Sequence, residues 1–377
     1  MSGTERWRIL ICPASEAKSS AMNSVTSEPL REICERVSDA HRSGRPLRLR
    51  GAGTKDFYGE CLDGEVLDLR RHRGIVDYEP SELVITVRCG TPLSEIETAL
   101  AEHDQFLAFE PPGFGGDPTI GGVIAAGLSG PRRMQVGAAR DFVLGVKLVA
   151  AAGEELRFGG RVMKNVAGFD VSRLLCGSLG VLGLITEVSL KVLPRPRCEQ
   201  SFTLKLPARE AVSVFNRWGS LPLPISAAAW FDGAAWIRLS GARSAVRSAA
   251  ERVGAQSVED AAAASFWNAL RHFTHPFFAA DELWRVSLPS NAEPLELPGN
   301  LLIDWGGALR WYAGDSCGAN IRAAAAANGG TALRWRGDAP AGRFHPLTPA
   351  VAQIHRRLKQ SFDPRGIFNR GRLVAGW

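Results

Sequence analysis

The chain has 377 residues, which is long for a single hydrophobic core, so we expect two domains. Its content of 45% hydrophobic and 22% charged residues is typical of a folded globular protein and excludes a disordered one. The net charge of +6 comes from short, scattered basic clusters such as Arg70–Arg71–His72–Arg73, so no nucleic-acid partner is expected.

The first third of the chain predicts helices and short strands separated by glycine-rich turns. Residues 1–24 have neither helical nor strand periodicity and are interpreted as a loose leader. Ser27 is the expected N-cap of a helix whose apolar residues recur at helical spacing until Gly44. Strands are then expected at 46–50, 66–69 and 83–88, and a helix is expected to open at Thr91–Pro92.

The stretch Pro111–Gly130 (PPGFGGDPTIGGVIAAGLSG) is the densest cluster of glycines. Apolar residues separate the glycines, and the stretch has no Lys, Arg or Glu, so we interpret it as buried backbone rather than as a linker. Glycine lets another group approach the main chain closely. Buried N–H groups need acceptors, which a polyanionic cofactor would supply; tightly packed core turns without a ligand are the alternative.

After this stretch, strands are expected at 142–150, 155–158 and 185–192, the last preceded by a second glycine-rich apolar segment at 177–183. The sequence Pro194–Arg197 breaks the pattern and is the expected domain boundary. Beyond it, tryptophans and alanine-rich helices alternate with short strands, which predicts a smaller α+β unit. The expected parts are therefore a leader (1–24), a first domain (25–196), a small α+β domain (197–345) and a terminal helix and tail (346–377).

The seven cysteines predict neither a metal site nor a disulfide framework. Their number is odd, and no two form a CxxC or CxC pair. This pattern favours a reducing compartment. No apolar run approaches the about 18 residues that span a membrane, and Ile9–Cys12 is too short for a secretion signal. We expect a cytoplasmic protein that reaches the inner face of the cytoplasmic membrane only through partners.

The loop after the first strand fails two common nucleotide-binding patterns. Gly51–Ala52–Gly53 follows a strand, but Asp56 occupies the last position of GxGxxG, so a Rossmann turn is excluded. Thr54 and Lys55 have the wrong order and spacing for a Walker A loop. What remains is a Gly-Ala-Gly-Thr-Lys loop, which either forms a nest of N–H groups for a pyrophosphate or is a plain turn.

Taken together, these segments resemble the vanillyl-alcohol-oxidase-type (PCMH) FAD-binding family. Arg50–Thr54 matches its RGxGT-like pyrophosphate loop. Pro112–Gly113 and Thr119–Gly122, continuing to Gly127, match its PG…TIGG…A…G segment. Further matches are the Arg-Asp-x-Val-Leu-Gly strand start at 140–145, the GSxGxLGxITxV stretch at 177–188 and the FDPRGIFN tail at 362–369.

The resemblance implies an α+β fold: a two-lobed PCMH-type FAD-binding domain, a smaller α+β cap-like domain and a C-terminal tail that returns to the FAD domain. It implies FAD held non-covalently, because the pyrophosphate loop has no histidine and no cysteine lies near Arg140. The residues that it implies in FAD binding are Arg50, Gly51, Ala52, Gly53, Thr54, Lys55, Pro112, Gly113, Thr119, Ile120, Gly121, Gly122, Ala126, Gly127, Arg140, Asp141, Gly180, Gly183, Ile185 and Asn369.

Within the family, Gly127–Arg133 and Val162–Asp170 look like the E subunit of bacterial glycolate oxidase. That resemblance implies a complex with a larger flavoprotein D subunit and an iron–sulfur F subunit, in which glycolate is oxidised to glyoxylate and FAD relays electrons. Two positions depart from the wider family. Gly130–Arg133 replaces a polar Asn-x-x-Gly end, and Arg370 stands where proline usually follows Asn369.

No catalytic residue and no metal ligand can be assigned from the sequence. Relatives that act on 2-hydroxy acids carry an HxGDGNxH-type cluster, which is missing here. The nearest candidate is the pair His272 and His275, whose alternative role is ordinary packing. The candidates for positive charges near a flavin or a substrate anion are Arg132, Arg133, Lys164 and Arg372; their alternative is a surface or interface role. Asp141 and Asp170 are expected to cap or brace loops.

Three hypotheses therefore stay open. The chain is an FAD-binding subunit whose chief substrate site lies in the D subunit, a self-sufficient FAD-dependent 2-hydroxy-acid dehydrogenase that uses the region of His272 and His275, or a scaffold subunit that has lost its flavin. The motifs that can be interpreted bind cofactor, so they do not identify the 2-hydroxy acid.

Overall fold

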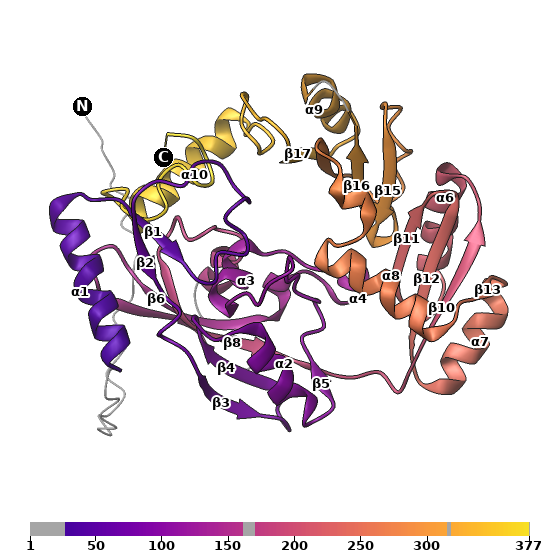
Figure 1. The fold of residues 1–377 in the computed structure, drawn as a ribbon, viewed down its shortest axis with the longest axis horizontal. Helices are drawn as coiled ribbons and strands as arrows, with labels where there is room; N and C mark the ends of the chain where they lie inside the picture. Colours follow the sequence, from indigo (N-terminus) through magenta and orange to yellow (C-terminus); the bar gives the residue numbers. More distant parts are fainter. Residues whose placement is uncertain (1–26, 161–169, 315–317, 377) are drawn as a thin grey trace, which may run out of the picture.

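The computed structural model describes residues 27–160, 170–314 and 318–376. Figure 1 shows two α+β parts side by side, with the terminal helix α10 (Pro349–Phe362) lying over the first part. The predicted α+β class is therefore confirmed. The leader 1–24, Lys164 and most of the motif Val162–Asp170 lie outside the described residues.

The first part is built on a five-stranded antiparallel sheet in the order β3-β4-β8-β6-β7. Its strands are β3 (Ile75–Glu79), β4 (Val84–Arg88), β6 (Val143–Val149), β7 (Glu155–Gly159) and β8 (Leu184–Lys191). Two small pairs complete it: the parallel pair β1 (Leu47–Arg50) with β2 (Glu65–Asp68), and the antiparallel pair β5 (Gln105–Phe106) with β9 (Leu193–Pro194). Its helices are α1 (Glu28–Ser43), α2 (Leu93–Ala101), α3 (Ile120–Ala126), α4 (Arg133–Val136), η1 (Ala139–Phe142) and α5 (Val171–Leu175).

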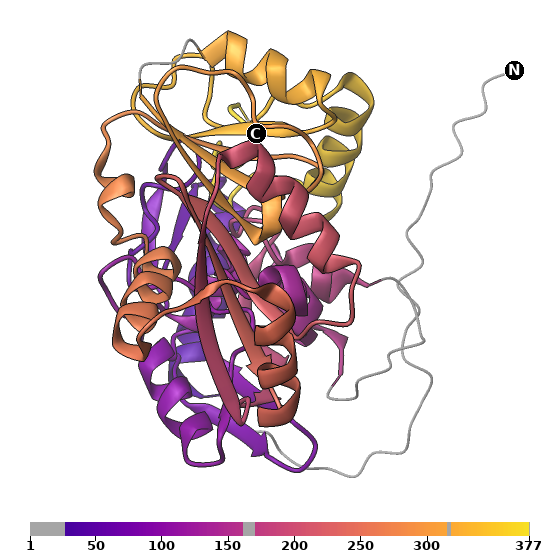
Figure 2. The same cartoon turned by 90° about the vertical axis from the view of Figure 1, so that its right-hand side faces the viewer.

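The second part is an eight-stranded sheet in the order β13-β10-β12-β11-β15-β16-β14-β17. The strands are β10 (Cys198–Lys205), β11 (Ile225–Phe231), β12 (Ala234–Gly241), β13 (Gln256–Ser257), β14 (Leu283–Ser287), β15 (Asn300–Asp304), β16 (Leu309–Ala313) and β17 (Thr331–Arg336). The helices are α6 (Ala208–Gly219), α7 (Arg243–Val253), α8 (Asp260–His272), η2 (Pro276–Ala279), η3 (Trp305–Gly307) and α9 (Gly318–Ala327). Figure 2 shows these strands standing in front of the first part.

Strand β11 explains how helices cover both faces of the second sheet. Successive side chains of a strand point to opposite faces. Ala227 and Ala229 accordingly join a core that includes α8 and residues of the first part, whereas Ala228 joins the core under α6 and α7. Because both faces are buried, the strand is a continuous apolar run rather than an alternating one. The α8 side of the sheet therefore faces the first part.

The local expectations for the first part are largely confirmed. Helix α1 buries Leu30, Ile33, Val37 and Ala40, the positions with helical spacing, and ends at Gly44 with φ 68°. Full burial of a leucine, isoleucine or valine side chain contributes about 1.5–3 kcal/mol. The expectation that the glycine-rich stretch is buried is confirmed only in part: Ile120, Val123 and Ile124 are no more than 1% exposed, whereas Gly115, Gly116 and Asp117 lie at the surface.

The C-terminal tail returns to the first part, as the fold prediction stated. The N–H of Leu47 donates to Ile367 O at 2.6 Å, and the N–H of Asn369 donates to Leu47 O at 2.9 Å, so the tail pairs with β1. Buried Lys359 donates from Nζ to Val181 O at 2.8 Å, Asp363 Oδ2 at 2.7 Å and Phe368 O at 2.9 Å.

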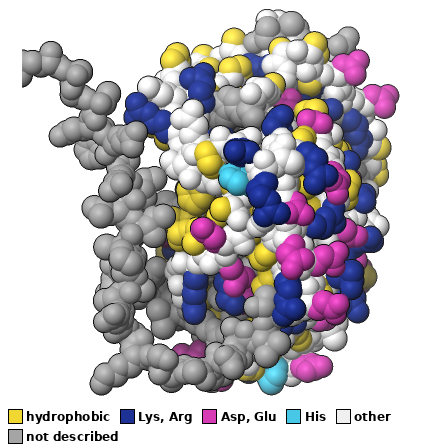
Figure 3. All heavy atoms as spheres, turned by 90° about the vertical axis from the view of Figure 1, so that its left-hand side faces the viewer, with side chains coloured by type: hydrophobic (Ala, Val, Ile, Leu, Met, Phe, Trp, Pro, Cys, Tyr) yellow, Lys and Arg dark blue, Asp and Glu magenta, His cyan; other side chains and the backbone are white. Residues whose placement is uncertain are grey.

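The surface and the helices add two observations. On the face in Figure 3, basic and acidic side chains are interspersed with apolar ones, so the net charge is not gathered there into a single stripe. Within the described ranges, no helix is both long enough and apolar enough to span a bilayer.

Candidate functional site

The loop that leaves β1 forms the first wall of a cleft. The turn favours glycine at position 53 because its φ is 75°, in the left-handed region, and the guanidinium of Arg50 lies beside the place of a Cβ. Asp56 ties the loop to β1: its Oδ2 accepts from Arg48 Nη2 at 2.6 Å and from Arg50 Nε at 3.0 Å. These ion pairs fix the loop with its backbone facing the cleft.

The start of α3 forms the second wall. A Cβ at Gly51 would collide with Thr119 Oγ1, so the two walls touch at a point where only glycine fits. The N–H groups of Ile120 and Gly121 already donate to Thr91 O at 2.9 Å and Cys89 O at 2.8 Å. Gly122 faces open space, since its Cβ would meet only Thr119 Oγ1, at 3.4 Å.

The third wall joins residues 179–185 to the C-terminal tail through Asn369. Its side chain accepts from the N–H of Leu49 at 2.7 Å and donates to Leu179 O at 2.6 Å. Gly180, with φ 72°, leaves room for this amide, because a Cβ there would lie 2.8 Å from Asn369 Nδ2. One side chain thus ties together three segments that are distant in the sequence.

The cleft between these walls has about 840 Å³ of empty space, including its open mouth. The predicted residues that line it are Arg50, Gly51, Ala52, Gly53, Thr54, Lys55, Thr119, Gly121, Gly122, Ala126, Gly180, Gly183, Ile185 and Asn369. Sequence reasoning named Arg372 only as one of several charges. The lining residues that it missed outside the matched motifs are Leu49, Asp56, Leu62, Leu69 and Cys89.

The other predicted residues are not among those that line the cleft and have structural contacts instead. Ile120 is fully buried in the core, because its position on α3 turns it away from the cleft. Gly127 ends α3 with φ 64°. The N–H of Gly113 donates to His272 Nδ1 at 3.1 Å. Asp141 accepts from the N–H of Ala138 at 2.8 Å, which is the bracing role expected for it. Pro112 is buried, and Arg140 lies in η1.

The cleft carries a positive charge that suits a diphosphate. Desolvation lowers the pKa of Lys55 to about 8 and that of Arg372 to about 10, so each is buried at a cost. Asp56 opposes the shift at Arg372, but neither cation forms an ion pair within the described residues. Arg372 donates from Nη2 to Lys55 O at 2.8 Å, while its buried Nη1 has no partner among the described residues. An anionic ligand in the cleft would satisfy this donor.

The two histidines proposed for catalysis have backbone partners. His272 Nδ1 accepts from Gly113, and His275 Nδ1 accepts from the N–H of Phe277 at 3.3 Å. Burial lowers the pKa of both imidazoles, which favours the neutral form that accepts these bonds. Arg132 belongs to an ion-pair network between the two parts, with Glu110 and Glu199. Asp170, by contrast, caps α5 as expected, accepting from the N–H of Arg173 at 3.2 Å.

An aromatic wall, formed by Phe57, Tyr58, Phe114, Phe273 and Trp335, stands beside Lys55, whose Nζ lies 5.6 Å from the Phe114 ring centroid. Burial raises the pKa of the Tyr58 hydroxyl. Arg285 lies close enough to oppose that shift, and its side chain forms no hydrogen bond or ion pair with the residues described. These residues come from both parts of the chain and share no motif, so the sequence carries no signal for the group.

Comparisons with known proteins agree with this geometry. The family described as FAD binding domain matches residues 25–159. The chain is 48% identical over 344 residues to glycolate oxidase subunit GlcE of Escherichia coli (strain K12), covering 91% of this chain and 97% of that protein. It is 34% identical over 158 residues to glycolate oxidase subunit GlcD of Bacillus subtilis, covering 41% of this chain and 33% of that one. A solved structure of alkyldihydroxyacetonephosphate synthase shares the fold, with a TM-score of 0.63 at 16% identity over 91% of this chain and 76% of that one.

Proposed function

Because the chain belongs to the FAD-binding oxidoreductase family that includes glycolate oxidase subunit GlcE, we propose that it is the FAD-binding subunit of a complex that oxidises glycolate to glyoxylate. The cofactor of this family is FAD. The observation that carries the proposal is the glycine-walled, positively charged cleft, with a buried donor on Arg372 that has no partner among the described residues.

In this proposal the loop Arg50–Lys55 holds the diphosphate, and the start of α3 forms the opposite wall. The glycine-rich loop presents backbone N–H groups at close range, while Lys55 and Arg372 neutralise the phosphate charge. Asn369 keeps the third wall in place. When bound, FAD supplies the capacity to accept two electrons from a hydroxy acid and to pass them on. The residues of this chain bind the cofactor, orient it and shield it from water.

We further propose that the chief substrate site lies in a larger flavoprotein subunit and that an iron–sulfur subunit accepts the electrons. Two observations support this role. The Nδ1 atoms of the two candidate bases, His272 and His275, accept hydrogen bonds from backbone N–H groups, and one relative is itself a subunit, GlcD, of a glycolate oxidase. The complex would place this chain in the cytoplasm, reaching the membrane through its partners.

A second candidate is a substrate site within this chain. Arg285 is the observation that favours it. Its guanidinium has no hydrogen-bond or ion-pair partner among the described residues, lies over the rings of Trp305 and Trp311 and is close to the half-buried Tyr58, so it could anchor a carboxylate. Purified chain that reduces a dye with glycolate alone, and loses this activity in Arg285→Met, would establish the second candidate.

Affinity purification of the tagged chain from native extract tests the first candidate. We expect a second flavoprotein and an iron–sulfur protein to co-purify and the pool to oxidise glycolate. Recovery of the chain alone, or of a pool without flavin, would contradict the proposal.

A further inference from the structure

A second cavity, with about 1020 Å³ of empty space including its open mouth, lies between the two parts of the chain and shares no lining residue with the cofactor cleft. Its walls come from β5, from the linker at Arg195–Pro196, from β10 and β12 of the second sheet, and from α8. The cavity therefore touches both parts of the molecule without involving the cofactor cleft.

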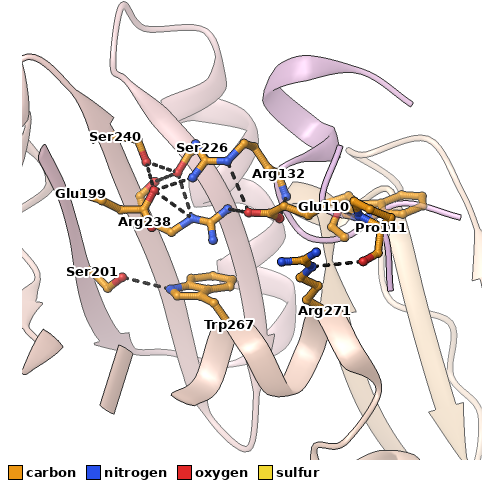
Figure 4. A network of polar contacts seen from close by, with 12 residues as sticks. Glu110, Pro111, Arg132, Glu199, Ser201, Ser226, Arg238, Ser240, Trp267 and Arg271 are labelled. Atoms are coloured by element: carbon orange, nitrogen blue, oxygen red, sulfur yellow. Dashed lines mark hydrogen bonds and ion pairs between the residues drawn. The ribbon is translucent and has the colours of Figure 1, made fainter. Parts of the chain in front are cut away.

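One wall of this cavity is a buried ion-pair network, shown in Figure 4. The side chains of Arg132 and Arg238 are 6% and 5% exposed. Both bind Glu110, at 3.3 Å from Arg132 Nε and 2.8 Å from Arg238 Nη2. Both also approach Glu199, by a hydrogen bond from Arg132 Nη2 and at 3.9 Å from Arg238 Nε. The network joins the first part to the second, because Arg238 and Glu199 lie on β12 and β10.

The arginines keep donors that the network does not use. Nη1 of Arg132 and Nη1 of Arg238 have no hydrogen-bond acceptor among the described residues, and neither atom is fully enclosed. Both arginines line the cavity. Their guanidinium groups lie 5.3 Å from the Phe106 ring and 5.2 Å from the Trp267 ring, so aromatic faces flank the donors.

The lining has an excess of positive charge. Its four arginines (Arg132, Arg195, Arg238 and Arg271) face three glutamates (Glu97, Glu110 and Glu199), which leaves 4 − 3 = +1. Glu97 pairs with Arg271, and the other two glutamates pair with the buried arginines. Arg195 is the arginine left without an ion pair in the described ranges; its guanidinium lies 5.8 Å from the Phe106 ring.

We propose that this cavity is a binding site for a short monocarboxylate, held across the two parts of the chain by Arg195 and the free Nη1 donors of Arg132 and Arg238. Guanidinium groups bind carboxylates with paired, charge-assisted hydrogen bonds. A single negative charge balances the lining, and the rings of Phe106 and Trp267 cover a short carbon chain. The site goes beyond the proposed function, because it requires neither flavin nor turnover.

Helix α8 connects this site to the start of the glycine-rich stretch, which leads to α3. Arg271 donates from Nε to Pro111 O at 3.1 Å, and the next residue, His272, accepts from the N–H of Gly113. A carboxylate that bridges the parts therefore stabilises the arrangement of α8 against residues 111–113. We expect ligand binding to raise the thermal midpoint of the holoprotein.

Acetate is the probe for the test, titrated into the purified holoprotein at constant ionic strength with chloride as the reference anion. Binding is followed by ligand-detected NMR and by the thermal midpoint, while the flavin absorbance reports on the cofactor cleft. The variant is Arg195→Gln, with Arg197→Gln as its matched control: Arg197 is also exposed, lies two residues away and does not line the cavity.

Acetate is expected to bind the wild-type protein and Arg197→Gln alike, without changing the flavin spectrum. Arg195→Gln is expected to weaken binding at least about tenfold, since it removes a charged hydrogen-bond donor. Asn268→Phe, which fills the cavity from the exposed face of α8, is expected to abolish binding. The proposal would be overturned if acetate did not bind the wild type, or if Arg195→Gln and Arg197→Gln bound it with equal affinity. It would also be overturned if binding changed the flavin spectrum and persisted in Arg195→Gln and Asn268→Phe.

Discussion

Two adjacent glycines of α3 should respond to the same substitution in opposite ways. Gly122 lines the cleft, and a Cβ there meets only Thr119 Oγ1, at the ordinary contact distance of 3.4 Å. A Cβ at Gly121 would lie 2.7 Å from the Cβ and 3.0 Å from the carbonyl oxygen of Cys89, which belong to the neighbouring chain segment. Gly122→Val should therefore fill the cleft, whereas Gly121→Val should strain the fold.

The expected magnitudes follow from these contacts. Overpacking against Cys89 costs about 1–3 kcal/mol, which lowers the thermal midpoint of Gly121→Val by several degrees. Replacing a helical glycine also limits the unfolded chain, so Gly122→Val should keep the apoprotein within about 1 kcal/mol of the wild type. The flavin-to-protein ratio from absorbance, measured with the melting curve of each apoprotein, separates the two effects. A Gly122→Val protein that retains stoichiometric FAD would refute the assignment of this wall.

The remaining predictions concern charges and the tail. The pKa of Lys55 is about 8, so below pH 8 this side chain is already protonated before FAD binds. Above pH 8 it must gain a proton to pair with the phosphate, so the affinity for FAD should fall by up to about tenfold per pH unit. Equilibrium titrations should show this slope in the wild type and not in Lys55→Gln, and a slope that persists in the variant would argue against Lys55. Asn369→Ala leaves the N–H of Leu49 unsatisfied, so it should cost about 1–3 kcal/mol and lower FAD occupancy; an unchanged melting curve would contradict this. Lys359→Met leaves Asp363 without its buried cation and should cost about 3 kcal/mol by denaturant unfolding, whereas the matched control Lys205→Met, at an exposed lysine, should leave stability nearly unchanged; equal losses in the two variants would refute the role of the buried pair.

The cofactor cleft was largely predictable because its geometry depends on glycine. Where two backbones touch, as at Gly51 and Thr119, or a turn needs positive φ, as at Gly53, few other residues fit. Such requirements are local and leave a pattern in the sequence. The buried helix α1 was predictable for a similar reason, since its apolar residues follow the helical period.

Contacts between distant segments left no such pattern. The side chain of Arg372 reaches Lys55 O, and Arg132 pairs with Glu110 and Glu199, although nothing in the spacing of these residues indicates a partner. Ile120 lies within a matched motif, yet helix geometry turns it into the core. Motif membership therefore predicted the segment that forms the wall but not which of its side chains face the cleft.

The central claim is that this chain binds FAD but depends on partner subunits to receive electrons from glycolate. The most direct measurement is the flavin absorbance of the purified chain at about 450 nm. It is followed anaerobically as glycolate is added, first to the chain alone and then to the chain with its partner subunits. We predict a flavin band at one FAD per chain that bleaches only when the partners are present. A colourless chain, or a band that glycolate bleaches without partners, would contradict the account.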